Sequence, residues 1–400
     1  MFWNILGRRH LTERHSPPPP ADFFRGRPED WPAHLRATIR RHGVTDLVML
    51  GDGRPVHAAA VDVAMANDVR IHVLEHGYIR PDWLTLEPDG MSGHSRMPRD
   101  PAVIVERARG LPAVAFTPLW RSSFLVYALY DFAYHLPNVF LGPFLHPHYR
   151  THGPVHPLVE YGGWVLKWIG TPFTRRHRDR VLPRYLDGDR PYFLFPLQLP
   201  GDYQIRRHAP FGDLFAIVRA TLRSFAADAP PECRLLFKVH PLDNGLSFWA
   251  RRIARWAREA AISDRIDLVD GGPLDSLIRR ARGVVSVNST VGLTALALNV
   301  PLVPLGNSVY DVEGMTHHGT LRSFWSNPTR PDPDLVDAFL RLLVDRIQLR
   351  GGFVGTDAIE AGARTATERI LETDERLPLS LRRERLQSFR YENELKRLLE

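Results

Sequence analysis

The sequence predicts an α/β protein of two Rossmann-like domains with parallel sheets, followed by C-terminal helices. Three observations carry this prediction. The 400 residues exceed what one ordinary hydrophobic core organises, so two domains are expected. Short apolar runs alternate with stretches of helical spacing, which is typical of parallel sheets. Several of these runs stop at polar residues or glycine, as strands do where they meet a ligand.

The first strand–helix–strand unit lies near the start of the chain. A buried strand at 46–50 ends in a Gly-Asp-Gly turn around Asp52, a helix covers about 55–67, and a second strand covers 70–76. Proline is tolerated in the first turn of such a helix. Because this unit has no GxGxxG motif, a dinucleotide cofactor is not expected.

A strict alternation of strands and helices begins near Arg190. The predicted strands cover roughly 191–197, 234–239, 265–269, 283–287 and 301–305, and the helices between them cover 210–227, 247–261, 273–281 and 291–299. This alternation implies a parallel sheet with right-handed crossovers. Further helices are predicted near 333–348, 357–373 and 379–399.

These elements divide the chain into four predicted segments. They are a flexible proline-rich N-terminus at 1–30, an N-terminal domain with an aromatic helical insert at 31–185, a C-terminal domain at 186–350, and C-terminal helices at 351–400. Four consecutive prolines make the first segment a stiff, extended spacer. The last helix is basic and amphipathic. We expect it to be packed or solvated, with membrane attachment as the alternative.

The composition limits the possible partners. A single cysteine, Cys233, excludes a disulfide framework and fits a reducing compartment. The net charge of +7 fits a solvated basic surface, an anionic lipid surface or an anionic substrate. The arginines are dispersed and no nucleic-acid-binding motif occurs, so nucleic acid is not expected. No run of 18 apolar residues occurs, so no membrane span is expected.

Residues 116–170 are rich in tyrosine, phenylalanine, tryptophan and histidine. Their histidines do not follow a zinc-ligand spacing, so no metal site is expected. The simplest interpretation is a set of helical core aromatics with a polar loop. An amphipathic groove or a membrane-facing surface is the alternative.

Two motifs of the second domain point to an anion site. Asn288, Ser289 and Thr290 follow a strand and open a helix, where backbone N–H groups and the helix dipole attract anions. The same residue types are also good helix caps without a ligand. His240 ends a second strand of the same sheet, and Pro241 stops further pairing there. Such a histidine can donate to a phosphate, although a lone one is more often structural.

Carboxylates form the third candidate site. Asp202 follows a predicted strand and Gln198, and Glu75 ends a strand of the other domain. A Pro-Gly-Asp sequence is common turn chemistry, and the segment after Glu75 also fits an ordinary surface loop. In the functional interpretation, Asp202 and Glu75 form a pair across the cleft between the domains. They would divide glycosyl transfer into nucleophile or stabiliser and general acid/base.

Together these blocks resemble the capsule polysaccharide biosynthesis proteins. The similarity rests on Lys-Val-His-Pro-Leu-Asp-Asn-Gly from 238, Val-Asn-Ser-Thr-Val-Gly-Leu-Thr-Ala-Leu from 287, and Leu-Gly-Asn-Ser-Val-Tyr-Asp-Val-Glu-Gly-Met-Thr from 305. The runs 75–87 and 196–205 fit the same pattern. Within this family the sequence is most similar to the retaining β-Kdo transferases that begin the Kdo linker of Gram-negative capsules. The similarity covers about residues 45–325.

This resemblance implies a GT-B-like fold with an acceptor domain followed by a nucleotide-sugar domain. It implies CMP-Kdo as donor, a phosphatidylglycerol-derived lysophospholipid or its growing Kdo chain as acceptor, and neither metal nor cofactor. The His-Pro motif is also similar to that of bacterial sialyltransferases, where it contacts the CMP phosphate. The nucleotide-sugar-binding residues implied in this way are Gln198, Lys238, His240, Pro241, Asn288, Ser289, Thr290 and Arg80.

The resemblance also implies catalytic roles. Retention of configuration suggests a double displacement with Asp202 as nucleophile and Glu75 as acid/base. Asp52 is a rival base, because its glycine-flanked turn resembles the acidic glycine turn near the active site of such enzymes. Arg80 is the candidate partner of the sugar carboxylate, since its planar fork binds a carboxylate through two hydrogen bonds.

The implied protein is cytoplasmic and peripheral at the inner face of the inner membrane, where other capsule assembly proteins are possible partners. Three alternatives stay open. The first is a transferase of the same architecture that uses CMP-sialic acid or a UDP-sugar. The second is a non-catalytic component of a capsule export complex. The third is a module that binds anionic lipid without nucleotide affinity.

Overall fold

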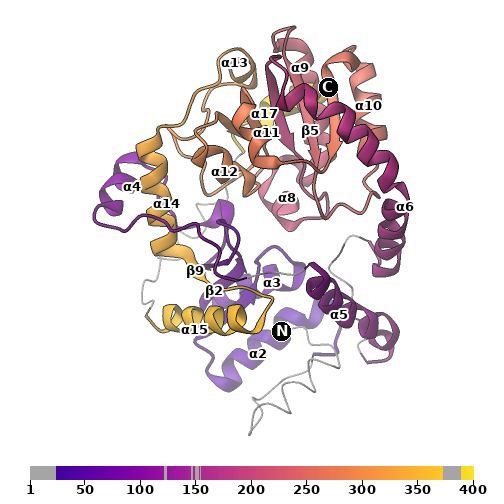
Figure 1. Ribbon diagram of the computed structural model, residues 1–400. Helices are drawn as coiled ribbons and strands as arrows, with labels where there is room; N and C mark the ends of the chain where they lie inside the picture. Colours follow the sequence, from indigo (N-terminus) through magenta and orange to yellow (C-terminus); the bar gives the residue numbers. More distant parts are fainter. Residues whose placement is uncertain (1–23, 121–123, 146, 149–152, 154, 373–388) are drawn as a thin grey trace. The chain divides into compact units, whose positions relative to one another are not determined.

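The chain forms two compact units that interleave in sequence. A computed structural model describes residues 24–120, 124–145, 147–148, 153, 155–372 and 389–400 (Figure 1). Unit 1 draws on 1–91, 116–157 and 348–382, and unit 2 draws on 92–115, 158–347 and 383–400. This division differs from the continuous segments expected at 31–185, 186–350 and 351–400, because the chain returns to each unit after building part of the other. Residues 1–23 of the proline-rich start and 379–388 of the predicted last helix lie outside the described residues.

Unit 1 is built on a four-stranded sheet with the strand order β1-β2-β3-β9. Its elements are η1 (Pro28–Asp30), α2 (Trp31–His42), β1 (Asp46–Leu50), α3 (Pro55–Ala66), β2 (Arg70–His76), β3 (Trp83–Pro88), α5 (Phe124–Leu145), β9 (Gln348–Arg350) and α15 (Thr356–Glu372). The parallel pair of β1 and β2, joined through α3, confirms the predicted strand–helix–strand unit. Strand β3 pairs antiparallel with β2, and β9 pairs antiparallel with β3. The parallel pairing expected for this unit is therefore limited to β1 and β2, and β3 and β9 extend the sheet with antiparallel pairs that the sequence did not predict.

The physical reason lies in the short connection between β2 and β3. A parallel neighbour needs a crossover of about a dozen residues or more, and the chain reverses here within a few. Buried polar contacts hold the reversal. The Tyr78 hydroxyl donates to Glu87 at 2.9 Å, and the Gln348 amide of β9 donates to the Thr85 hydroxyl at 2.8 Å. Because Gln348 is far away in sequence, its contact with Thr85 could not be read from the local pattern.

Unit 2 is built on a five-stranded sheet with the order β6-β5-β4-β7-β8, in which every pair is parallel. Its strands are β4 (Tyr192–Pro196), β5 (Arg234–Val239), β6 (Ile266–Asp270), β7 (Gly283–Ser286) and β8 (Leu302–Pro304). Its helices are η2 (Ser92–His94), α4 (Pro101–Ala108), α6 (Pro157–Val181), α7 (Pro183–Leu186), α8 (Tyr203–His208), η3 (Pro210–Gly212), α9 (Leu214–Asp228), α10 (Trp249–Glu259), η4 (Ser263–Arg265), α11 (Leu274–Arg280), α12 (Val291–Ala297), α13 (Leu321–Ser326), α14 (Pro333–Ile347) and α17 (Glu392–Leu399). The predicted parallel sheet is confirmed here, together with the α/β class.

The strands of unit 2 are apolar on both faces, as expected for a parallel sheet covered by helices. Phe193, Phe195 and Phe237 face one fully buried core, which α9, α10, α13 and α17 complete. Leu194 and Leu236 alternate with them and are also fully buried. Because all strands of this sheet run parallel, the residues that follow them gather at one edge.

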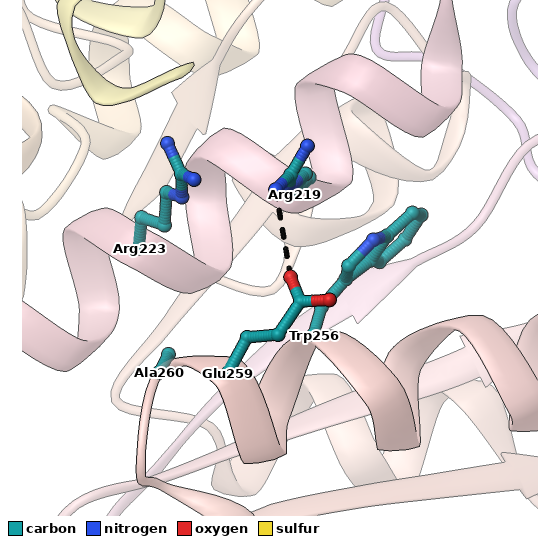
Figure 2. A pocket seen from close by; sticks show the side chains of 5 residues that line it. All are labelled: Arg219, Arg223, Trp256, Glu259 and Ala260. Carbon is teal, nitrogen blue, oxygen red and sulfur yellow. Dashed lines mark hydrogen bonds and ion pairs between the residues drawn. The ribbon is translucent and has the colours of Figure 1, made fainter. Parts of the chain in front are cut away.

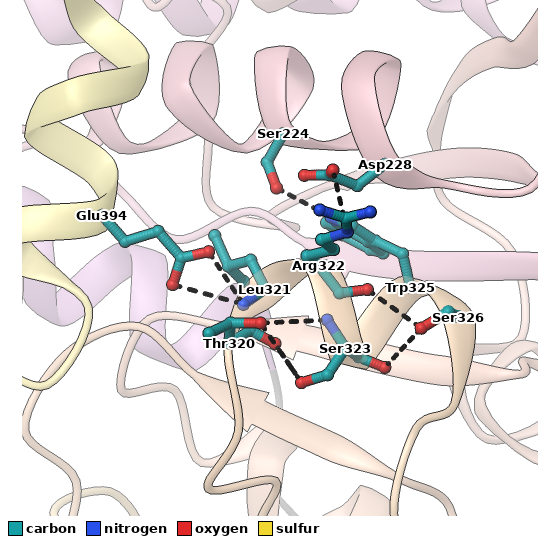
Figure 3. Close-up of polar contacts among 9 residues, drawn as sticks. All are labelled: Ser224, Asp228, Thr320, Leu321, Arg322, Ser323, Trp325, Ser326 and Glu394. Carbon is teal, nitrogen blue, oxygen red and sulfur yellow. Dashed lines mark hydrogen bonds and ion pairs between the residues drawn. The ribbon is translucent and has the colours of Figure 1, made fainter.

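The last helix is fastened to this core through α13 (Figure 3). The Trp325 indole donates to the Ser224 hydroxyl of α9 at 2.9 Å, and the Glu394 carboxylate of α17 accepts from the Leu321 backbone at 3.0 Å. Leu395 of α17 is fully buried. Helix α17, the described part of the predicted last helix, is therefore packed against unit 2. In the part of the chain that is described, no helix has the length and apolar character that a membrane crossing needs.

Candidate functional site

The candidate donor site lies at the carboxyl edge of the unit 2 sheet. Strands β5, β4 and β7 are neighbours in that order. His240 follows β5, Gln198 follows β4 and Asn288 follows β7, each within two residues of the strand end. The structure therefore brings the two predicted phosphate-binding motifs to one edge. Strand spacing sets the ends of β5 and β7 about 10 Å apart. A nucleotide lying across the end of β4 would meet both motifs.

His240 is half-buried just beyond the end of β5. Its Nδ1 accepts a hydrogen bond from the Leu242 backbone N–H at 3.1 Å. A neutral imidazole that accepts at one nitrogen carries its proton on the other, so Nε2 is the donor. This is the tautomer that recognition of a phosphate oxygen requires.

Two lysines meet beside this edge. Lys238 is only 6% exposed, and burial lowers its pKa, an effect that Asp270 opposes and Lys167 reinforces. The Lys167 ammonium of α6 lies 3.2 Å from the Asp270 carboxylate and donates to the Asp243 carbonyl at 2.6 Å. Sequence reasoning missed Lys167. One signal was available, since Lys396 is the chain's only other lysine among 52 cationic residues.

Asn288 and Gln198 hold each other rather than extending freely from the sheet. The Gln198 amide donates to the Asn288 side chain at 2.9 Å, and the Asn288 amide donates to the carbonyls of Gln204 and His208 at 2.8 and 3.2 Å. These bonds fix the turn after β7 against α8. Direct contact of either amide with a nucleotide stays a prediction.

The rest of that turn, Ser289 and Thr290, is held from beneath by Tyr310. Its hydroxyl donates to the Ser289 carbonyl at 2.6 Å, and a side chain on Gly292 would collide with the Tyr310 ring. Helix α12 begins after Thr290 and has seven residues, so its dipole is smaller than the sequence argument assumed. Any anion binding here would therefore rest mainly on the hydroxyls and backbone N–H groups of the turn.

Asp202 is exposed and forms the N-cap of α8. Its carboxylate accepts from the Gln204 backbone N–H at 2.9 Å. This contact agrees with the turn interpretation of the sequence and also fixes the direction of the carboxylate. The predicted pair of Asp202 and Glu75 joins residues of different units. Their pairing stays a prediction.

Within unit 1 the carboxyl edge gathers Asp52, Glu75 and a histidine that sequence reasoning missed. A Cβ on Gly51 would lie 3.0 Å from the Glu75 carboxylate, so Glu75 lies against the turn that contains Asp52. Asp52 is buried and accepts from the Met91 N–H at 3.1 Å. His57 of α3 donates from Nδ1 to the Gly51 carbonyl at 2.8 Å, and burial lowers its pKa. Asp52 and Glu75 therefore lie at the same edge of unit 1, and their acid/base roles stay predictions.

Arg80 lies in the loop that follows Glu75. It is exposed, and its Nε donates to the Gly77 carbonyl at 3.4 Å. A Cβ on Gly77 would lie 2.5 Å from the Trp83 carbonyl, so the start of this loop tolerates only glycine. The loop therefore has a defined shape, and Arg80 extends from it toward solvent.

A shallow pocket elsewhere in unit 2 lies away from these residues (Figure 2). It is lined by Arg219, Arg223, Trp256, Glu259 and Ala260, and Arg219 and Glu259 approach to 3.5 Å. The last turn of α10 supplies part of the lining and leads toward the start of β6. Because this is the amino edge of the sheet, the pocket is separate from the candidate donor site.

Two known proteins similar to this chain are named as capsule polysaccharide proteins. The chain is 32% identical to the capsule polysaccharide export protein KpsS of Escherichia coli over 327 residues, which is 80% of this chain and 82% of that protein. It is 30% identical to the capsule polysaccharide modification protein LipB of Neisseria meningitidis serogroup B over 332 residues, covering 81% and 78% of the two chains.

Among solved structures, Thermosulfurimonas dismutans KpsC, described as a β-Kdo 2,7 transferase, matches over 92% of this chain and 97% of its own. The identity is 14% and the TM-score is 0.46. A match at this level adds nothing to the sequence relationship. The model of the family described as capsule polysaccharide biosynthesis protein matches residues 45–354, more than three quarters of the chain. The chain therefore belongs to the capsule polysaccharide biosynthesis protein family.

Proposed function

We propose that the protein is a retaining glycosyltransferase that transfers Kdo from CMP-Kdo to a phosphatidylglycerol-derived lipid or to the Kdo linker growing on it. Family membership supports the role in capsule assembly. The observation that carries the donor assignment is His240, which ends a parallel strand with Nε2 as its hydrogen-bond donor. The 288–290 turn lies at the same edge and offers further donors.

The donor is an anion, and the unit 2 edge carries matching charge. CMP-Kdo has a phosphate and a sugar carboxylate. In the proposal, His240 and the hydroxyls of Ser289 and Thr290 hold the phosphate. Lys238 and Lys167 supply positive potential from the β5 side. Arg80 of unit 1 is our candidate partner for the sugar carboxylate.

The proposed chemistry is a double displacement. The Asp202 carboxylate attacks the anomeric carbon and CMP leaves with the electron pair of the broken bond. A base then takes the proton of the acceptor hydroxyl, whose oxygen displaces Asp202 and restores the original configuration. Glu75 and Asp52 are the candidate bases, since both lie at the carboxyl edge of unit 1. We expect neither metal nor cofactor, because CMP is itself a good leaving group.

A lipid acceptor implies work at a membrane surface. We therefore place the protein at the cytoplasmic face of the inner membrane, with capsule assembly proteins as possible partners. The basic charge of +7 supports attraction to anionic lipid as well as to the donor.

A donor panel tests this function. Purified protein is incubated with lysophosphatidylglycerol and, in separate reactions, CMP-Kdo, CMP-sialic acid or UDP-N-acetylglucosamine. Nucleotide release and the mass of the lipid product are measured. We expect turnover with CMP-Kdo alone and a loss of at least about 100-fold in His240→Ala, as for a group that stabilises the leaving phosphate. His42→Ala, which changes an exposed histidine of α2, is the matched control.

One relative is named as an export protein, so the non-catalytic alternative is tested in the same assay. Full turnover in both Asp202→Ala and His240→Ala would refute the site. Turnover of the UDP-sugar without turnover of CMP-Kdo would refute the donor. No turnover of any donor, together with normal folding by circular dichroism, would favour the non-catalytic component.

A further inference from the structure

Helix α6 exposes a large apolar face that the unit 2 core does not use. Its members are Val165, Leu166, Trp168, Ile169 and Phe173, each more than half exposed. Trp168 and Phe173 reach 78% and 74% exposure. These positions follow helical spacing, so they share one side of the helix. Side chains of this size are costly to leave in water, and a contiguous set of them marks an interaction surface.

The opposite side of α6 packs against the loop that follows His240 in the candidate donor site. A Cβ on Gly163 would lie 3.1 Å from the Asn244 carbonyl, so the helix packs closely on the loop after His240. Four residues later, Lys167 donates to the Asp243 carbonyl of that loop at 2.6 Å. Further along, a Cβ on Gly271 would lie 3.3 Å from the Arg178 guanidinium. Because these contacts fix one side of α6, the apolar face is held outward as a rigid surface.

Positive charge continues the apolar face toward the end of the helix. Ile169, Phe173, Arg176 and Arg180 follow one another at spacings of four, three and four residues, and Arg175 is adjacent to Arg176. All three arginines are exposed. An apolar side rich in tryptophan and phenylalanine, bordered by arginine, has the character of an interfacial helix. Arginines held near an anionic lipid surface are attracted to it electrostatically.

We propose that the apolar face of α6 and its three arginines dock unit 2 onto an anionic bilayer, with α6 lying in the interface. This inference deepens the proposed function, because a lipid acceptor has to be met at a bilayer. The contacts of Gly163 and Lys167 would then hold the loop after His240 close to the lipid headgroups.

Positive charge distinguishes α6 from α5, another helix with an exposed apolar side. Helix α5 of unit 1 also exposes large side chains, among them Phe140 and Phe144. Its residues 124–145 contain neither lysine nor arginine. An anionic bilayer attracts α6 through its apolar side chains and its arginines, but attracts α5 through apolar side chains alone. Helix α6 is therefore the docking element.

Vesicle sedimentation of the full-length protein tests the proposal without any donor. Vesicles of phosphatidylglycerol and phosphatidylethanolamine are compared with vesicles of phosphatidylcholine, at low and high salt. We expect salt-sensitive binding to the anionic vesicles. The double variants Trp168→Ser/Phe173→Ser and Arg175→Glu/Arg176→Glu should each weaken it by about tenfold or more. Leu371→Ser on α15, which changes a side chain 80% exposed, and Arg251→Glu on α10 are controls that should bind normally.

The outcomes separate this proposal from the proposed function. If both α6 double variants bind anionic vesicles like the unchanged protein, the docking surface is refuted whatever the donor assay shows. If the α6 variants lose vesicle binding while CMP-Kdo is not turned over, docking stands and the transferase assignment fails. Light scattering measures the oligomeric state and so tests the alternative that a second copy of the chain binds this face. A dimer that Trp168→Ser/Phe173→Ser converts to monomer, with vesicle binding unchanged, would identify an interface between copies and overturn the proposal.

Discussion

At the scale of single residues, Asp46 illustrates how neighbours set the state of a carboxyl. Burial alone would raise its pKa, but hydrogen bonds from Arg70 and His72 outweigh burial and hold the pKa well below the ordinary 3.8. The Arg70 guanidinium lies 2.7 Å and His72 Nε2 2.8 Å from the carboxylate. Sequence reasoning placed Asp46 only as the start of a strand. Arg70 and His72 lie on the neighbouring strand β2, where Arg70 is the register partner of Asp46.

Asp46→Asn should lower the free energy of unfolding by about 1–2 kcal/mol at neutral pH, because it removes charge-assisted bonds. A group with a depressed folded-state pKa contributes stability above its unfolded pKa and loses it as the pH falls. The difference between the two proteins should therefore shrink below about pH 4. Urea unfolding at several pH values measures it. Asp62→Asn, at an exposed position of α3, should show no such pH dependence.

A second residue prediction concerns Tyr310, which supports the turn of the candidate donor site. Tyr310→Phe removes the hydrogen bond to the Ser289 carbonyl and keeps the ring that packs on Gly292. A loss near 1 kcal/mol corresponds to about fivefold weaker binding of CMP, measured by calorimetry. Tyr130→Phe on α5 is the control. Unchanged CMP affinity in Tyr310→Phe would remove the turn from the site.

At the scale of elements, the edge strand β9 shows what a distant segment contributes. Gln348 of β9 is 2% exposed and bonds to the Thr85 side chain and to the Ile79 backbone. Gln348→Leu would remove both bonds and leave the buried Ile79 N–H unsatisfied, at a cost of about 1–3 kcal/mol, while the Thr85 hydroxyl would keep its bond to the His76 carbonyl. Thermal unfolding should show a lower Tm for this variant than for Glu360→Gln, an exposed change on α15. An unchanged Tm would mean that β3 orders without β9.

Much of the element pattern was predictable, and its failures have a common cause. The parallel strands of unit 2 were predicted to within one residue at each end, because each is an apolar run bounded by polar or glycine residues. Strands β3 and β9 were not identified. The β3 segment was treated as a loop because of its polar residues, yet Thr85 and Glu87 are fully buried with polar partners. The partner of Thr85, Gln348, lies far away in the sequence, so no local window around β3 contains that contact.

At the scale of the whole molecule, the net charge of +7 has two interpretations that salt separates. If the basic charge concentrates the anionic donor, the affinity for CMP should fall steadily with ionic strength, because screening shortens the reach of the field. If it is only a solvated surface, the affinity should stay flat. Calorimetric titration of CMP over a range of salt concentrations decides this, with adenosine as an uncharged control ligand.

The sequence by itself determined the α/β class, the parallel sheet of unit 2 and the placement of His240 and the 288–290 turn at one sheet edge. These follow from hydrophobic periodicity and from the rule that parallel strands end together. Only the tertiary structure decided the antiparallel half of unit 1, the interleaved units, and the contacts of Lys167 and His57 with the candidate sites. The physical reason is the separation along the chain between the residues that make these contacts. Periodicity reports which side of an element is buried, while partner, tautomer and pKa depend on atoms supplied by distant parts of the chain.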